Sequence, residues 1–178
     1  MMSAEMNPGR DEGTSDATVG YRGPVACAAA GITYRQLDYW ARTGLVVPGV
    51  RAATGSGTQR LYSFRDIVVL KVVKRLLDAG VSLQNIRKAI ATLREHGASD
   101  LADITLISDG STVYECRSPE EVVDLLRGGQ GVFGIALAGA VKEIEGSVTV
   151  LPGERADDVA APVPIDELAR RRARRAAS

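Results

Sequence analysis

One stretch of the chain places arginine, tyrosine and glutamine side chains at the spacing of a single helical face. The apolar Leu37, Trp40 and Ala41 of the same stretch share the opposite face, which would attach the helix to a scaffold. Guanidinium groups donate forked hydrogen bonds to phosphate oxygens and to guanine, while amide and hydroxyl groups reach other base edges in the major groove. The polar residues of this stretch are Tyr34, Arg35, Gln36, Tyr39 and Arg42. Their types and spacing favour contact with nucleic acid.

A second group of basic residues lies in residues 51–62, where Arg51 and Arg60 flank a segment of Gly, Ser and Thr. Glycine lets the backbone approach a phosphate, and the two guanidinium groups can donate charge-assisted hydrogen bonds to it. The segment ends in Leu61 and Tyr62, which are better strand formers. We therefore expect a small hairpin, or wing, with Arg60 as its strongest binding candidate.

The chain has no net charge, but its charges are unevenly distributed. Residues 20–96 hold 12 Lys and Arg against 4 Asp and Glu, whereas residues 97–178 hold 9 against 14 and residues 1–19 hold 1 against 4. A positive excess confined to one segment is typical of a phosphate-binding surface. The alternative is a small helical domain with a solvated basic face, because charged helix faces often serve solubility alone.

Capping and breaking residues indicate how the segment around the first basic group folds. Pro24 suits a first helical turn, and Gly31 ends the alanine-rich helix expected over residues 25–30. Thr33 can cap a second helix over residues 34–42. A helix, a glycine-containing turn and a second helix make up the helix-turn-helix pattern.

Two further helices are expected after the wing. Ser63 stands three residues before Asp66, as in a capping box, in front of a helix that Gly80 ends. Ser82 begins another helix, whose apolar residues recur at helical spacing until the periodicity stops near His96. Residues 20–97 are therefore expected to form four helices plus a wing hairpin, a winged helix-turn-helix domain that binds double-stranded DNA.

A different kind of sequence follows this domain. Asp109-Gly110 between strand formers predicts a β-hairpin over residues 104–116. The cap, proline and carboxylates of Ser118-Pro119-Glu120-Glu121 predict a helix with one apolar stripe. Residues 131–137 are interpreted as a buried strand and residues 147–151 as a further candidate strand. We expect residues 98–151 to be a small α+β domain that serves dimerisation or binds an effector.

Both ends of the chain have the composition of disordered segments. Residues 1–19 carry almost no large apolar residue, and residues 152–178 combine a Pro-, Asp- and Ala-rich linker with an arginine-rich tail. The expected fold is therefore mainly α, with a winged helix-turn-helix domain, a small α+β domain and disordered termini.

The sequence offers little for catalysis or for holding a cofactor. His96 is the only histidine, and we expect it at the surface. Cys27 and Cys116 lie far apart without the spacing of metal ligands, so we expect reduced, packed thiols. No run approaches the roughly 18 apolar residues of a membrane span. We expect a cytoplasmic protein that is not an enzyme and uses no metal or cofactor.

The order of these motifs resembles the MerR family of bacterial transcription regulators. The matching residues, within about residues 21–95, are Ala26-Cys27, Gly31-Ile32-Thr33, Arg35-Gln36-Leu37-Asp38-Tyr39-Trp40, Gly44-Leu45, Arg60-Leu61-Tyr62-Ser63, Asp66-Ile67, Leu76, Gly80, Ser82-Leu83 and Ile86. The resemblance implies a homodimer on a palindromic promoter site, with the second helix in the major groove and the wing on the backbone. It also implies DNA contacts from Arg35 and Tyr39 on the helix and from Arg60 and Tyr62 on the wing.

Three features depart from the family pattern. Asp38 stands where relatives commonly carry an arginine, and it would repel a phosphate unless it pairs with a neighbouring arginine. Gly23-Pro24 replaces the usual apolar-Gly start of the first helix. The long dimerisation helix of the family should follow the fourth helix, but helical periodicity ends near His96. We expect residues 98–151 to provide the dimer interface instead.

Three hypotheses about function follow. The first is a dimeric, sequence-specific regulator that works with RNA polymerase, because many relatives activate transcription by bending and untwisting the promoter. The second is an architectural or nucleoid protein with the same fold and little sequence preference. The third is a DNA-tethered sensor that binds a small-molecule effector through residues 98–151.

Overall fold

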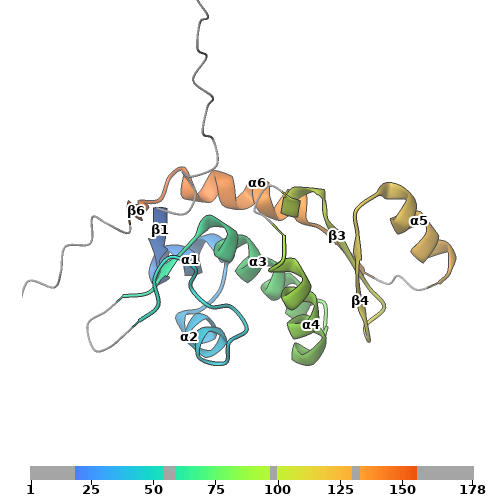
Figure 1. The fold of residues 1–178 in the computed structure, drawn as a ribbon, viewed down its shortest axis with the longest axis horizontal. Helices are drawn as coiled ribbons and strands as arrows, with labels where there is room; N and C mark the ends of the chain where they lie inside the picture. Colours follow the sequence, from blue (N-terminus) through green and yellow to red (C-terminus); the bar gives the residue numbers. More distant parts are fainter. Residues whose placement is uncertain (1–18, 54–58, 97–99, 130–132, 156–178) are drawn as a thin grey trace, which may run out of the picture.

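The computed structural model describes residues 19–53, 59–96, 100–129 and 133–155, which Figure 1 shows as coloured ribbon. The helices of its N-terminal part are α1 (Gly23–Ala30), α2 (Tyr34–Arg42), α3 (Phe64–Asp78) and α4 (Leu83–Leu93). The turn between α1 and α2 passes through Gly31 at a φ of 72°, a left-handed conformation that glycine adopts without strain. The chain is therefore a mixture of helices and small sheets with a helix-turn-helix at its N-terminal end.

Hydrogen bonds from side chains explain where these helices begin. The Thr33 hydroxyl accepts a hydrogen bond from the Gln36 backbone N–H at 3.2 Å, and Gln36 Oε1 accepts one from the Thr33 N–H at 2.9 Å. Ser63 and Asp66 form the same reciprocal capping box at the start of α3, and the Ser82 hydroxyl caps α4. The helix starts predicted at Thr33, Ser63 and Ser82 are confirmed.

A three-stranded sheet joins both ends of the described chain. Strand β1 (Val19–Arg22) pairs antiparallel with β2 (Leu61–Tyr62) on one side and with β6 (Glu154–Arg155) on the other. Gly20 is buried at the point where a Cβ atom would lie 2.8 Å from Leu61 Cβ, so a side chain would force the strands apart. The expectation that residue 19 is in a disordered tail and residues 154 and 155 in a linker is wrong, because backbone pairing orders them.

The second sheet has the strand order β4-β3-β5, with β3 (Thr105–Ser108), β4 (Val113–Cys116) and β5 (Phe133–Ala136). The hairpin predicted from Asp109-Gly110 is confirmed by β3 and β4, which pair antiparallel. Of the strand expected over residues 131–137, residues 131 and 132 lie outside the described residues, and of the four β5 residues only Ile135 is buried.

Helix α6 (Leu137–Val148) is the main departure from the sequence prediction. It was not expected, and its last turn covers the start of the segment 147–151 that we interpreted as a strand. Leu137, Ala140, Val141 and Ile144 are buried along one of its faces, a helical spacing that the sequence does contain. Figure 1 shows α6 lying along α1 and α3.

The buried residues of α6 belong to the same hydrophobic core as those of α1 to α4. The Glu143 carboxylate of α6 also forms ion pairs with Lys71, at 2.8 Å, and with Arg75, both on α3. Residues 137–155 are therefore part of the helix-turn-helix body, and the core does not end at residue 97 as the expected domain boundary implied. The remaining segment, the 3₁₀ helix η1 (Asp100–Asp103) and β3 to β5 with helix α5 (Pro119–Arg127), lies at one end of this body (Figure 1). Its Leu101, Ile104, Leu106 and Ile135 join the same hydrophobic core.

Candidate nucleic-acid interface

Helix α2 presents one apolar and one polar face, as the sequence predicted. Leu37 and Trp40 are each 2% exposed and attach the helix to the core. On the other face Tyr34 is 63% and Tyr39 46% exposed, and Arg35 makes no ion pair with any described residue. These three side chains are available to a partner that approaches α2 from solvent.

Gln36 and Arg42 are already partly engaged in the free protein. The side-chain oxygen of Gln36 closes the capping box of α2, so this residue positions the helix start. The Arg42 guanidinium lies 3.0 Å from Asp38, one turn earlier on the same helix. The structure thus divides the five predicted residues of α2 into three unengaged side chains and two that hold local structure.

The wing, residues 51–62, is described at its base, whereas residues 54–58 lie outside the described residues. Arg51 and Leu61 form an antiparallel bridge, and Arg51 Nε donates a hydrogen bond to the Gln59 carbonyl at 3.3 Å. Arg60 Nη1 lies 2.9 Å from Asp38 Oδ1, so the wing is joined to α2 through this carboxylate. The condition set by the sequence, that Asp38 needs a neighbouring arginine, is met by two arginines.

Tyr62 is the one predicted DNA-contacting residue whose side chain is inside the protein. It is 0% exposed in β2, and burial raises the pKa of its hydroxyl to about 12, although Arg60 opposes the shift. Its ring packs in the hydrophobic core, so it does not offer a surface to DNA in this conformation. Its hydroxyl is buried without a hydrogen-bond partner among the described residues, so a contact between Tyr62 and DNA stays a prediction that would require the side chain to become accessible.

A hollow of about 460 Å³ lies between the start of α1, the front of α2 and the wing, and we call it the α2–wing hollow. Arg22, Tyr34, Asp38 and Arg60 line it. Arg22, the last residue of β1, was not among the predicted residues, and its guanidinium pairs with Glu154 of β6 at 2.6 Å. Hydrogen-bond donors from three elements therefore meet at one concave place.

Several basic residues that contribute to the positive segment are structural. Arg87 and Arg94 of α4 donate hydrogen bonds to the carbonyls of Thr43, Gly44 and Leu45, just after α2 ends. Arg65 donates to the Leu93 carbonyl at the end of α4. Lys71 and Arg75 are likewise ion-paired with Glu143. Fewer basic side chains of residues 20–96 are therefore free for a partner than the charge count alone suggests.

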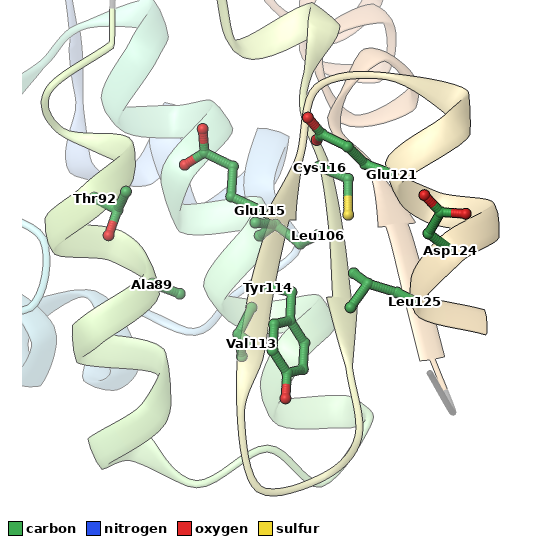
Figure 2. Close-up of a pocket in the computed structure, with 10 residues that line it drawn as sticks. All are labelled: Ala89, Thr92, Leu106, Val113, Tyr114, Glu115, Cys116, Glu121, Asp124 and Leu125. Carbon is green, nitrogen blue, oxygen red and sulfur yellow. The ribbon is translucent and has the colours of Figure 1, made fainter. Parts of the chain in front are cut away.

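A second hollow, of about 700 Å³, lies around β4 between α4 and α5, and we call it the β4 hollow. Figure 2 shows Glu115 on the α4 side of the strand and Cys116 directed toward Glu121 and Leu125 of α5. Glu115 is paired with His96, at 3.0 Å, and with Arg117, at 2.9 Å. His96 is thus partly buried in a hydrogen-bonded cluster with Glu115 and Arg117, whereas we expected it at the surface.

The two cysteines are free thiols in the structure. Burial raises the pKa of the Cys27 thiol, and burial together with the charges of Glu121 and Glu115 raises that of Cys116. Among the described residues, no three His, Cys, Asp or Glu side chains gather as metal ligands would. None of the described helices has the length and apolar character needed to cross a membrane.

A helix-turn-helix whose second helix exposes arginine and tyrosine defines a DNA-binding protein. Residues 21–93 match the model of the MerR HTH family regulatory proteins. The chain is 64% identical, over 178 residues, to uncharacterized HTH-type transcriptional regulators of Mycobacterium bovis and Mycobacterium tuberculosis, an alignment covering 97% of this chain and 78% of each relative. It is also 28% identical over 83 residues to the HTH-type transcriptional regulator HmrR of Sinorhizobium medicae, covering 46% of this chain and 54% of that protein.

The chain belongs to the MerR family of HTH-type transcriptional regulators. A further relative, the heavy metal-dependent transcription regulator 1 of Rhizobium meliloti, is 29% identical over 73 residues, which are 41% of this chain and 48% of that protein. Regulators of this type bind DNA and are not generally enzymes.

Proposed function

We propose that the protein binds double-stranded promoter DNA as a homodimer and reads a palindromic site through α2. The observation that carries this proposal is the polar front of α2, where Tyr34, Arg35 and Tyr39 are exposed opposite the buried Leu37 and Trp40. An α-helix anchored in this way fits the major groove, and arginine and tyrosine can then reach base edges and phosphates.

The α2–wing hollow supports a contact with the DNA backbone next to the groove. Arg60 lines it from the wing, and Arg22, the last residue of β1, lines it next to the start of α1. In the free protein Arg60 is paired with Asp38 and Arg22 with Glu154, at 2.6 Å, so a phosphate would compete with both carboxylates. Arginines on both sides of a concave place can donate charge-assisted hydrogen bonds to the oxygens of one phosphate. In this arrangement α2 provides sequence readout, and the wing fixes the register of the protein on the duplex.

Substitution of Arg35 and of Arg60 tests the proposal directly. Each change to alanine should weaken binding to a DNA selected from a random-sequence pool by roughly 1–3 kcal/mol, because a charge-assisted contact is lost. Lys142→Ala, which removes the same charge from the exposed face of α6, is the matched control and should leave affinity unchanged. Unchanged binding in both test variants, measured by fluorescence anisotropy, would remove α2 and the wing from the interface.

The homodimer is proposed through the segment that lies at one end of the body. Val123 and Leu126 of α5 and Phe133 of β5 are exposed by 42%, 52% and 37%, so the segment carries apolar surface that another copy can cover. Two DNA-binding bodies held together also bind a palindrome far more tightly than one.

Sedimentation of the free full-length protein tests the dimer. Val123→Glu should convert a dimer to a monomer, because the carboxylate would be buried without a partner. Val150→Glu is the matched control, since Val150 is 83% exposed beyond the end of α6 and lies outside the proposed interface. A wild-type monomer, or a Val123→Glu dimer, would contradict this interface.

The way in which the dimer acts on transcription is proposed from family membership. In this mechanism the dimer distorts the promoter so that RNA polymerase can use it. DNA should therefore bend or untwist when the protein binds. Footprinting on selected and scrambled duplexes separates this regulator from an architectural protein, which would protect both equally.

The β4 hollow favours a second candidate function, that of an effector sensor. Its carboxylates, Glu115, Glu121 and Asp124, lie beside Tyr114 and Leu125, so a ligand with one positive charge and an apolar body matches its lining. A thermal-shift screen of small organic cations should then find ligands that stabilise the wild type but not Asp124→Asn. Stabilisation of both proteins alike would place the ligand elsewhere.

A further inference from the structure

We propose that Asp38 is an internal competitor of the DNA phosphate: it holds the wing arginine Arg60 in the free protein and releases it when DNA binds. The inference rests on the proposed DNA-binding function and adds an intramolecular competition that lowers its affinity.

Both oxygens of Asp38 are occupied by arginines of the proposed interface. Oδ1 accepts a hydrogen bond from Arg60 Nη1 at 2.9 Å, and Oδ2 lies 3.0 Å from Arg42 Nη2. The side chains of Asp38 and Arg60 are 32% and 23% exposed, so their contact is partly shielded from water, whereas Arg42 is 68% exposed. The contact with Arg60 is therefore the stronger of the two restraints.

The Asp38 carboxylate occupies the place that a DNA phosphate would need in order to contact Arg60. Asp38 and Arg60 line the same α2–wing hollow. Carboxylate and phosphate oxygens accept hydrogen bonds from a guanidinium in the same forked geometry, so either can satisfy Arg60. A phosphate bound to Arg60 would lie beside the charge of Asp38, and like charges at that separation repel each other.

Asp38 is charged in the free protein over the whole neutral range. The hydrogen bond from Arg60 and the charge of Arg42 hold the pKa of this carboxyl below its usual range. Arg60 therefore exchanges one anion for another when DNA binds, and the net gain from its phosphate contact is smaller than for an unpaired arginine. The device lowers affinity and at the same time keeps the wing positioned against α2.

A double-mutant cycle on the full-length chain tests the competition, with a duplex selected by the wild type from a random-sequence pool. Asp38→Asn should bind about fivefold more tightly than the wild type, as expected when a partly exposed ion pair no longer has to be broken. Glu145→Gln on α6, an exposed carboxylate of the helix that lies across the body from α2 (Figure 1), changes the net charge equally and should alter affinity less than twofold.

The Arg60→Gln background separates competition from simple repulsion. If Asp38 acts by holding Arg60, Asp38→Asn gains less in this background than in the wild type. If Asp38 only repels DNA, the gain persists or grows because the carboxylate has lost its main partner, and this result would overturn the proposal.

The other possible outcomes of this experiment also test the competition. Weaker binding by an Asp38→Asn protein whose urea unfolding matches the wild type would show that Asp38 assists Arg60, which contradicts competition. Wild-type binding without any gain in Asp38→Asn rejects the competition alone and leaves DNA binding intact. Absence of binding by both proteins rejects the proposed function and the competition together.

Discussion

Helices α2 and α5 begin with the same kind of cap but pack in different environments. Thr33 caps α2 and Ser118 caps α5, each through a hydrogen bond from the backbone N–H three residues later. Both helices also have an apolar face. α2 buries Leu37 and Trp40 completely, whereas no residue of α5 is buried and Leu126 is 52% exposed.

The difference shows that a cap decides where a helix starts and that packing decides what the helix contributes to stability. A single hydrogen bond closes locally, within three residues, whereas burial of a stripe needs a partner from elsewhere in the chain. α2 has that partner in α1 and in the core, and α5 contacts mainly the edge strand β4. The unburied stripe of α5 is the surface that we assign to the dimer.

The largest expected effect comes from ending the chain at Gly97. This cut removes a packed element, α6, together with an exposed one, α5. A chain that ends at Gly97 loses α6 and β6, and with them the partners of α1, α3 and β1. We expect it to lack a cooperative unfolding transition in circular dichroism. A truncated chain that melts like the full-length protein would mean that residues 98–151 form a separate domain, as the sequence alone suggests.

The second prediction compares one leucine from each helix. Leu37→Ala should lower the free energy of unfolding by roughly 2–5 kcal/mol, because it leaves a cavity in a packed core. Leu126→Ala should change it by less than about 0.5 kcal/mol, since the side chain is already half in water. Urea unfolding at a protein concentration where the chain is monomeric measures both, and equal losses would contradict the comparison.

The third prediction concerns the two caps. Thr33→Ala should lower global stability by about 1 kcal/mol, because α2 can unfold only together with the core. Ser118→Ala should open α5 alone, which raises amide exchange in residues 119–127 and leaves the global transition unchanged. The comparison fails if Ser118→Ala shifts the global transition as far as Thr33→Ala does.

The smallest effect concerns the ion pairs that hold α6 on α3. The hydrogen bond from Lys71 and the charge of Arg75 lower the pKa of Glu143 from its ordinary value of 4.5. A carboxylate with a lowered folded pKa stabilises the protein above its unfolded pKa and loses this contribution as the pH falls through the folded value.

Urea unfolding below pH 5 should therefore show a shallower loss of stability in Glu143→Gln than in the wild type. Glu145→Gln, which removes an exposed carboxylate from the same helix, is the control and should follow the wild-type curve. Parallel curves for all three proteins would show that Glu143 does not fasten α6.

Much of the helical structure within the described parts of residues 23–93 could be predicted, because its signals are local. The starts of α2, α3 and α4 follow from Thr33, Ser63 and Ser82, each of which bonds to a backbone N–H three residues away. Helix α6 has no such cap, so only the spacing of its apolar residues marked it, and glycines interrupt that spacing. Strand β1 carried no local signal at all, because its pairing partners are about 40 and 135 residues away.

The candidate site divides in the same way. The alternation of polar and apolar residues along α2 was enough to identify Arg35 and Tyr39 as exposed, because a helix that buries Leu37 and Trp40 must turn them outward. Composition could not reveal that Tyr62 is inside, that Arg87 and Arg94 are used on backbone carbonyls, or that Asp38 holds Arg60 across 22 residues of sequence. Only the folded chain decides these partners, because side-chain hydrogen bonds and burial depend on distances in space, whereas caps and helical faces depend on neighbours in the chain.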